Sequence, residues 1–321
     1  MFASEIDANA RAVYFKNFGV LPFGDITSIE TKQFIPETFD VLCAGFPCQA
    51  FSQAGRHGGF NDAKNRGMLY RQVVEIAAAH HPKAIFCENV RGLLSRTGVF
   101  PIIRRDIEAV GYDVLFSGIL NSVDYGVAQN RERLYIVAVR RDIATRLHTR
   151  GIEFPNPPPA LPGTIRKTIG DIRDDGPVDK RYYIGESYLQ TLIRHRNRHK
   201  DSADGHSGFG FIVRRDDEIA GTLMCGGMGR ERNMLLDENQ PDWADVPGSP
   251  RKGGINHLHY RFLTIREMAK LQGFPDYFEP SESMWIAFKQ FGNCVTVNTI
   301  RAVARALLNY LHHDKEPRHE H

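Results

Sequence analysis

The stretch "VLCAGFPCQAFSQAG" (Val41–Gly55) decides the fold, because an apolar strand within it breaks open into a loop. Apolar residues up to Ala44 suit the interior of a parallel sheet. Gly45 and Pro47 then end the strand, so Cys48 is expected at the carboxyl end of that strand. Open α/β sheets build their ligand sites at this end. We therefore expect an α/β fold with a site around Cys48.

On both sides of this stretch, short β-rich runs alternate with helical runs as far as about Arg140, which indicates βαβ units. Strands are expected in "FDVLCAGF", "KAIFCENV", "DVLFSGIL" and "RLYIVAVRR", the last two as a final pair. Helices are expected in "RGMLYRQVVEIAAAHHP" and "FPIIRRDIEAVGY". Near the C-terminus, the apolar patterning predicts two more helices, in "LTIREMAKLQGFP" and "VTVNTIRAVARALLNYLHH".

The character of the chain changes at "FPNPPPALPG" (Phe154–Gly163), whose prolines predict an extended linker. Beyond it, to about Leu258, the sequence is polar and glycine-rich with weak periodicity. We predict a catalytic and cofactor-binding domain over residues 1–154 and a smaller irregular domain over 155–258. Residues 259–321 are predicted to return to the first domain.

The composition is that of an ordinary globular protein, with 42% hydrophobic and 25% charged residues among 321. A net charge of +3 is too small to establish a nucleic-acid partner by itself. The sequence contains no apolar run that could span a membrane, and no signal peptide is visible at its start. Its five cysteines include no CxxC pair, which favours free thiols in a reducing compartment. We expect a cytoplasmic protein without a metal site.

Polar residues at further strand ends indicate chemistry. Glu88 closes the strand "FCENV", and a thiol and a carboxylate at adjacent strand ends can address one small molecule from two sides. Arg131 and Arg133 lie two residues apart as the chain enters a strand, and paired guanidinium groups suit phosphate or carbonyl oxygens. Taken alone, each of these groups is more often an ordinary surface charge. The other strand and C-terminal thiols are expected to be inert core groups: Cys43, Cys87 and Cys294.

A different chemistry at Cys48 has to be weighed. His57 lies close in sequence to Cys48, as in a thiol hydrolase. Such enzymes also need a third group to orient the histidine and an oxyanion site, and the sequence supplies neither. We therefore disfavour the hydrolase.

Five blocks occur in the order found in the DNA (cytosine-5) methyltransferase family, which the chain resembles: "GFPCQAFS", "ENVRGLL", "QNRERLYIV", "RFLTIREMAKLQGFP" and "FGNCVTVNTI". Five ordered blocks are far more specific than a lone motif, and they span almost the whole chain outside its middle segment. The resemblance implies a Rossmann-like methyltransferase sheet with a smaller target-recognition domain. It implies methyl transfer from S-adenosylmethionine to carbon 5 of cytosine in a specific duplex DNA sequence. A bacterial modification enzyme with a restriction endonuclease as functional partner is the implied setting.

The resemblance also implies roles for four catalytic residues. Cys48 matches the nucleophile that adds to carbon 6 of a flipped-out base. Glu88 matches the acid that holds N3 and the amino edge of the base, and burial is expected to keep it protonated for proton donation. Arg133 matches the residue that contacts the base carbonyl, and Arg131 matches one that orders the site.

Binding residues are implied in the same way. Cofactor contacts are expected from Glu5, Ile6, Asp25, Ile26, Pro47, Asn293 and Val295. DNA contacts are expected from Gln49, Ser52, Gln53, Arg56, Thr222, Arg230 and Arg232. The basic run "IRHRNRHK" (Ile193–Lys200) is either a solvated helix face or a phosphate contact.

The sequence departs from the family at its front, because no FxGxGG-type turn precedes "FASEIDANA". We expect a fragment or a mis-started product whose sheet lacks its first strand, which leaves neighbouring strand edges unpaired. Two alternatives stay open: a catalytically inactive DNA-binding remnant, or a subunit that needs a separate chain for the cofactor turn. An RNA substrate is a further variant.

Overall fold

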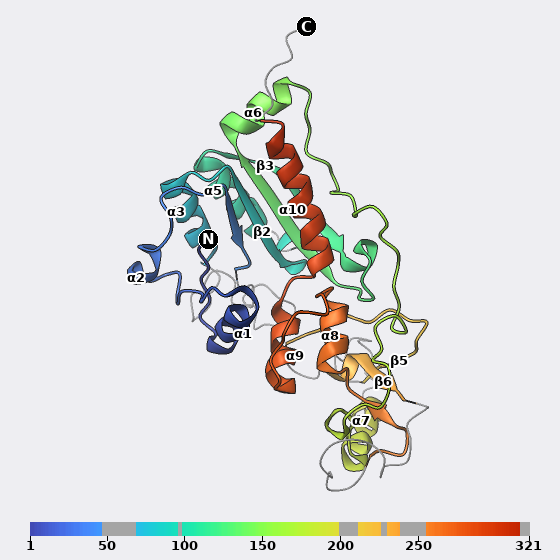
Figure 1. Cartoon of the computed structure of the whole chain (residues 1–321). Helices are drawn as coiled ribbons and strands as arrows, with labels where there is room; N and C mark the ends of the chain where they lie inside the picture. Colours follow the sequence, from blue (N-terminus) through green and yellow to red (C-terminus); the bar gives the residue numbers. More distant parts are fainter. Residues whose placement is uncertain (47–68, 96–97, 199–210, 226–229, 238–254, 315–321) are drawn as a thin grey trace. The chain divides into compact units, whose positions relative to one another are not determined.

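A computed structural model describes residues 1–46, 69–95, 98–198, 211–225, 230–237 and 255–314 (Figure 1). The chain divides into two compact units. The first unit comprises Met1–Asn121, Glu132–Pro162 and Thr299–His321, and the second comprises Ser122–Arg131 and Gly163–Asn298.

The first unit is built on a four-stranded sheet with the order β1-β2-β4-β3. Its strands are β1 (Val41–Ala44), β2 (Ala84–Val90), β3 (Tyr112–Asn121) and β4 (Glu132–Arg140). β1 and β2 run parallel, whereas β4 is antiparallel to both of its neighbours. The apolar runs of β2 and β4 are buried almost throughout, as the two inner strands of a covered sheet must be. This mixed sheet confirms the predicted α/β fold.

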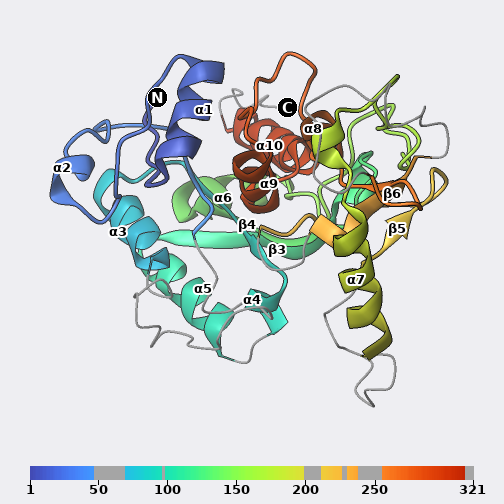
Figure 2. The ribbon, with the colours of Figure 1, turned by 90° about the horizontal axis from the view of Figure 1, so that it is seen from below.

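Helices lie on both faces of this sheet. In chain order the helices of the first unit are α1 (Ala8–Phe18), α2 (Ile29–Lys32), α3 (Tyr70–His80), α4 (Gly92–Ser95), α5 (Val99–Ala109), α6 (Arg141–Thr149) and α10 (Val297–His312). α3 and α5 cover one face, and α10 lies over the other (Figures 1 and 2). Val73 of α3 and Ile103 of α5 pack in one cluster with Ile85 and Ile136 of the sheet. This packing explains the periodic apolar residues of both helices.

The N-terminal segment, residues 1–40, is held by local contacts and by surface ion pairs such as Lys32–Glu75, which joins it to α3. α1 buries none of its side chains and is fixed at its ends by the Asp7 side chain and by Gly19, whose φ of 67° suits glycine. A single parallel bridge joins Ser4 to Phe23. Phe23 also stacks between two other rings, with centroid distances of 5.2 Å to Phe2 and 4.6 Å to Phe34. The segment therefore contains little of the unit's core.

Neighbouring strands give their cysteines opposite environments. Among the described residues, β1 pairs with β2 alone, and Cys43 of β1 is exposed. The prediction of a core thiol at Cys43 is wrong, because β1 forms an edge of the described sheet. Cys87 of β2 is buried, and burial raises the pKa of its thiol to about 12. Cys294 is half-buried.

The second unit contains a smaller sheet with the order β5-β6-β7. Its elements are η3 (Ser122–Tyr125), η4 (Lys180–Tyr182), α7 (Glu186–Arg198), β5 (Val213–Arg214), η5 (Arg230–Asn233), β6 (Met234–Leu236), β7 (Tyr260–Arg261), α8 (Ile265–Leu271) and α9 (Met284–Asn293). α8 begins with a capping box between Thr264 and Glu267. Glu267 also forms a buried ion pair with Arg261, with 2.8 Å between its Oε2 and the Nη1 atom. These contacts fix β7 against the start of α8.

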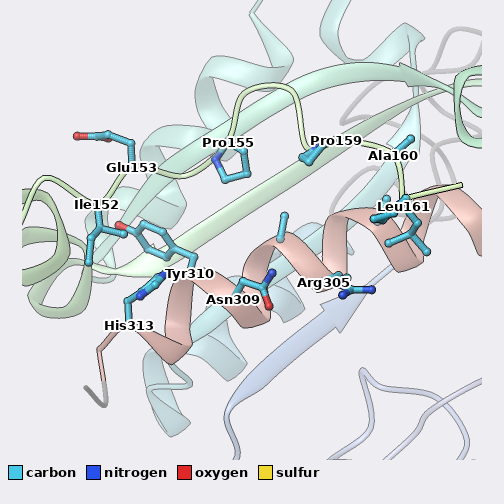
Figure 3. Close-up of a pocket in the computed structure, with 13 residues that line it drawn as sticks. Ile152, Glu153, Pro155, Pro159, Ala160, Leu161, Arg305, Asn309, Tyr310 and His313 are labelled. Atoms are coloured by element: carbon cyan, nitrogen blue, oxygen red, sulfur yellow. The ribbon is translucent and has the colours of Figure 1, made fainter. Parts of the chain in front are cut away.

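The proline-rich segment Phe154–Gly163 forms no helix or strand and lines a pocket of about 260 Å³ beside α10 (Figure 3). Pro155 and Leu161 form one wall, and Tyr310 and Arg305 belong to the helix opposite. None of the predicted site residues lines this pocket. Across the described part of the chain, no helix has the length and apolar character needed to cross a membrane.

Candidate active site

Glu88 and Arg133 form an ion pair on the two inner strands of the first unit's sheet. In the antiparallel register of β2 and β4, Glu88 lies opposite Tyr135 and Val90 lies opposite Arg133. Arg133 is therefore the diagonal neighbour of Glu88 on the same face. Its Nε atom lies 3.2 Å from the Glu88 Oε1 atom, and the two side chains are only 15% and 14% exposed.

The Arg133 side chain is fixed beside this carboxyl group by a hydrogen bond from its Nη1 atom to the Glu132 carbonyl oxygen at 2.8 Å. The pair presents carboxylate oxygens and guanidinium N–H groups side by side, and these atoms can hold the polar edge of a planar ring.

Asn89 connects β2 to the exit of β1. Its side chain is buried, and its Nδ2 atom donates a hydrogen bond of 3.1 Å to the Phe46 carbonyl oxygen. The Oδ1 atom accepts from the Val90 N–H group at 2.9 Å. Phe46 directly precedes Pro47 and Cys48 in the sequence. Asn89 therefore fixes the position from which the predicted nucleophile segment starts.

The predicted nucleophile and its loop lie outside the described residues. This applies to Pro47, Cys48, Gln49, Ser52, Gln53 and Arg56. Their roles remain predictions based on the sequence.

Arg131 and Arg133 have different binding partners, although they are two residues apart. Arg131 precedes β4, belongs to the second unit and is 2% exposed. Its guanidinium group donates to three backbone carbonyl oxygens, those of Leu223 (2.9 Å), Gly292 (3.0 Å) and Cys294 (2.7 Å). Arg131 thus joins two segments that are distant in the sequence.

The predicted cofactor residues near the N-terminus lie on two neighbouring segments. The parallel bridge between Ser4 and Phe23 places Glu5 and Ile6 alongside the segment that holds Asp25. Glu5 is exposed and accepts a hydrogen bond of 2.8 Å from the Asp7 N–H group. Asp25 is exposed and accepts from the backbone and the hydroxyl of Thr27, both at 2.8 Å. Ile6 is 74% exposed, and Ile26 is half-buried.

The remaining predicted residues belong to the second unit. Asn293 is the exposed last residue of α9, and Val295 is half-buried two residues further on. Thr222 is half-buried, and its hydroxyl donates to the Asn130 carbonyl oxygen at 2.8 Å. Arg232 lies half-buried in η5, which begins at Arg230.

Two residues that organise these segments were not singled out from the sequence. They are Asn89, which fixes Phe46, and Gln129, whose side chain is fully buried. Both are amides within or directly before an apolar strand, where a polar side chain has to be hydrogen-bonded to be tolerated. That signal is present in "FCENV" and "AQNRERLYIV", but it does not say which backbone groups are bound.

Comparison of the sequence with known proteins identifies relatives over almost its full length. Residues 1–309 match the family model described as C-5 cytosine-specific DNA methylase. The type II methyltransferase M.HpaII of Haemophilus parainfluenzae is 42% identical over 317 residues, which cover 97% of this chain and 83% of that protein. M.HhaI of Haemophilus parahaemolyticus is 31% identical over 311 residues, covering 95% and 86%.

Solved structures show the same fold at low sequence identity. The methyltransferase EhMeth of Entamoeba histolytica superposes with a TM-score of 0.68 at 19% identity, covering 98% of this chain and 90% of that one. The S. pombe Dnmt2 methyltransferase gives a TM-score of 0.66 at 18% identity, covering 97% and 90%.

Proposed function

Because the chain belongs to the C-5 cytosine-specific DNA methylase family, we propose that it transfers a methyl group from S-adenosylmethionine to carbon 5 of cytosine in a specific sequence of double-stranded DNA. The observation that carries this proposal is the half-enclosed Glu88–Arg133 pair. When protonated, the Glu88 carboxyl group can donate its O–H to N3 of cytosine and accept from the amino group with its other oxygen, and Arg133 can donate to the carbonyl oxygen of the base. A base can reach such a pair only after leaving the duplex, as enzymes acting on bases require.

The proposed chemistry begins with Cys48, because carbon 5 of cytosine is a poor nucleophile. The Cys48 thiolate adds to carbon 6, and the electron pair of the 5,6 double bond moves toward N3, which Glu88 protonates. Carbon 5 of the resulting enamine would then take the methyl group as the methyl–sulfur bond of the donor breaks, with S-adenosylhomocysteine as the leaving group. Transfer of the carbon 5 proton to water restores the 5,6 double bond and expels the Cys48 thiolate, and N3 returns its proton to Glu88. Arg133 donates to the base carbonyl oxygen throughout.

The position of Asn89 supports this assignment. A nucleophile has to be placed within a few tenths of an ångström of the reacting carbon to gain from proximity. Asn89 belongs to the same strand as Glu88 and is bonded to Phe46, two residues before Cys48. Glu88 and the residue from which the nucleophile segment starts are thus both anchored to β2, and Arg133 joins them from the neighbouring strand β4.

S-Adenosylmethionine supplies an electrophilic methyl group in this reaction. The chemistry of the N-terminal acids fits this cofactor: the exposed oxygens of Glu5 and Asp25 can accept hydrogen bonds from ribose hydroxyl groups and the adenine amino group. Ile6, 74% exposed beside them, offers an apolar surface for the adenine ring. We assign Ile26 and Pro47 to the same nucleotide end, and Asn293 and Val295 to the methionine end.

The DNA partner is assigned to Thr222, Arg230 and Arg232 of the second unit and to the loop that follows Cys48. Gln49, Ser52, Gln53 and Arg56 in that loop would contact the DNA around the extruded base. M.HpaII and M.HhaI are named type II methyltransferases, which supports a setting beside a restriction endonuclease. That endonuclease is a functional partner rather than a bound subunit.

The test measures transfer of labelled methyl groups from S-adenosylmethionine to unmethylated genomic DNA, followed by nucleoside analysis. We expect 5-methylcytosine as the product, full loss of transfer in Cys48→Ala, and retention of transfer in Cys43→Ala, which changes an exposed thiol on the same strand-loop segment. Equal transfer by Cys48→Ala would contradict the mechanism. Duplex binding without any methyl transfer would indicate a DNA-binding remnant. Methyl transfer to RNA alone would contradict the assignment of DNA as the substrate.

A further inference from the structure

The segment Ala220–Cys225, here called the recognition stem, leads along the chain to the predicted DNA-contacting residues Arg230 and Arg232. It is hydrogen-bonded to residues 128–131, which precede β4. The Ala220 N–H group donates to the Ala128 carbonyl oxygen at 2.9 Å, and the Asn130 N–H group donates to the Ala220 carbonyl oxygen at 2.8 Å. The stem therefore lies beside residues 128–131 as a short parallel pair.

Side chains strengthen this pairing where the stem turns away. The Gln129 Oε1 atom accepts from the Leu223 N–H group at 2.9 Å, and Arg131 Nη1 donates to the Leu223 carbonyl oxygen at 2.9 Å. Both polar backbone groups of Leu223 are thus held by neighbouring side chains. The other end of the Gln129 amide, Nε2, donates to the Leu271 carbonyl oxygen at 2.8 Å. Leu271 ends α8, where carbonyl groups lack partners within the helix.

The stem is also confined on a second side. A Cβ atom on Gly292 of α9 would lie 2.5 Å from the Cys225 nitrogen and 2.7 Å from its Cα atom, so only glycine allows this close approach of two backbones. The Asn233 side chain binds both polar backbone groups of Gly221: its Oδ1 atom accepts from the N–H group at 2.7 Å, and its Nδ2 atom donates to the carbonyl oxygen at 3.0 Å. The backbone of the stem is thereby fixed at several successive residues.

From these contacts we infer that Gln129 is a positioning residue for DNA sequence recognition, a role that rests on the proposed function. Base-reading groups discriminate by hydrogen-bond geometry, and that geometry depends on how rigidly their backbone is held. Gln129 is fully buried and joins the stem to the end of α8, so its loss removes the side-chain partners of the Leu223 N–H and Leu271 carbonyl groups and leaves Leu223 held by Arg131 at its carbonyl oxygen alone. A looser stem accepts incorrect bases more readily, while the chemistry at Cys48 is untouched.

The test compares Gln129→Leu with Asn256→Leu. Asn256 is the matched control because it is also fully buried and also bridges backbone groups of the second unit, at Ile184 and Tyr260, away from the stem. Methylated cytosines are mapped in a library of random duplexes, and kcat and KM are measured on the preferred site and its single-base variants. We expect Gln129→Leu to lower the preference for the correct site by about ten-fold or more, the scale of one mismatched base pair.

Hydrogen exchange gives a readout that does not depend on catalysis. In Gln129→Leu, a peptide covering residues 220–225 should exchange faster than in the wild type, whereas in Asn256→Leu it should not. Unchanged discrimination in Gln129→Leu, or an equal loss in both variants, would overturn the inference. If the wild-type chain transfers no methyl groups, the proposed function fails instead, and discrimination in duplex binding then decides the role of Gln129.

Discussion

The two acids assigned to opposite ends of the reaction, Glu88 and Glu5, stand in contrasting surroundings. Glu88 lies on an inner strand, is 14% exposed and is paired with Arg133. Glu5 is exposed on a segment that a single β-bridge joins to its neighbour. Buried groups fixed by strand register are positioned before any ligand arrives, whereas surface groups gain their order partly from the ligand.

The same contrast holds for whole regions of the first unit. One face of β2 and β4 is covered by α3 and α5, and the apolar side chains on that face form one cluster with both helices. The N-terminal segment is held by helix caps, one bridge, a stack of three aromatic rings and surface contacts such as the Lys32–Glu75 ion pair with α3, and α1 buries none of its side chains. The region assigned to the base is thus set by the core, and the region assigned to the cofactor is set by local and surface contacts.

Between the regions of Glu88 and Glu5, the largest expected effect is that of Glu88→Gln, which removes the proton donor but keeps the shape of the side chain. We expect the rate of methyl transfer to fall by roughly 10²–10⁴-fold, the usual contribution of one placed acid. The control is Glu132→Gln, which changes a more exposed acid that pairs with Arg91. A Glu88→Gln variant as fast as this control would remove the base-holding role of the pair.

Substitutions in the sheet and in the N-terminal segment should differ in their effect on the free energy of unfolding. Ile136→Ala opens a cavity beneath a fully buried side chain of β4 and should cost about 2–5 kcal/mol in the free energy of unfolding. Leu21→Ala removes a side chain that is 55% exposed in the N-terminal segment and should cost less than about 0.5 kcal/mol. Denaturant titration of both variants measures the difference. Equal losses would mean that residues 1–40 are packed more firmly than their contacts indicate.

A smaller effect is expected at the proposed cofactor site. Ile6→Ala should weaken binding of S-adenosylmethionine by roughly ten-fold, because it removes an apolar surface from the adenine ring. The melting temperature should barely change, since Ile6 is 74% exposed. Ile29→Ala, which changes a side chain that is 78% exposed, is the control. Calorimetric titration gives the affinities, and equal affinity in both variants would remove Ile6 from the site.

The smallest expected effect is a difference in alkylation rate between the cysteines of β1 and β2, and it needs no substitution. At pH 8 Cys87 should resist alkylation, because its pKa of about 12 keeps it in the thiol form and its side chain is buried. Burial also raises the pKa of the Cys43 thiol, but Cys43 is exposed on the neighbouring strand and should be labelled before Cys87. Mass spectrometry of peptides after brief iodoacetamide treatment reads both sites. Labelling of Cys87 at the rate of Cys43 would contradict the burial of β2.

The inner strands and the helices that cover them could be predicted from the sequence, because their buried side chains produce a visible pattern of apolar residues. The apolar runs of β2 and β4 and the periodic faces of α5 and α10 follow directly from the side chains that they bury. α1 carries cap signals at Asp7 and Gly19, but it buries no face and therefore shows no periodicity to detect. Local pattern predicts an element well only when the core selects that pattern.

The residues of the candidate site could likewise be predicted only in part. Glu88 and Arg133 could be named because strand ends and a two-residue spacing are visible locally. The partners of Arg131 could not be foreseen, because Leu223 and Gly292 lie 92 and 161 residues away in the sequence. Gln129 was missed for the same reason. A buried amide has to be hydrogen-bonded, but its partners are set by long-range topology that the local sequence does not show.

The most direct test of the central claim, covalent attack by Cys48 on a base held by Glu88 and Arg133, uses a duplex with 5-fluorocytosine at the mapped target. Fluorine cannot leave carbon 5 as a proton does, so the methylated adduct should remain attached to the protein. Intact mass measurement in the presence of S-adenosylmethionine should then show chain, DNA and one methyl group in a single species, absent in Cys48→Ala. Methyl transfer to ordinary cytosine in the same duplex without any such species would contradict the account.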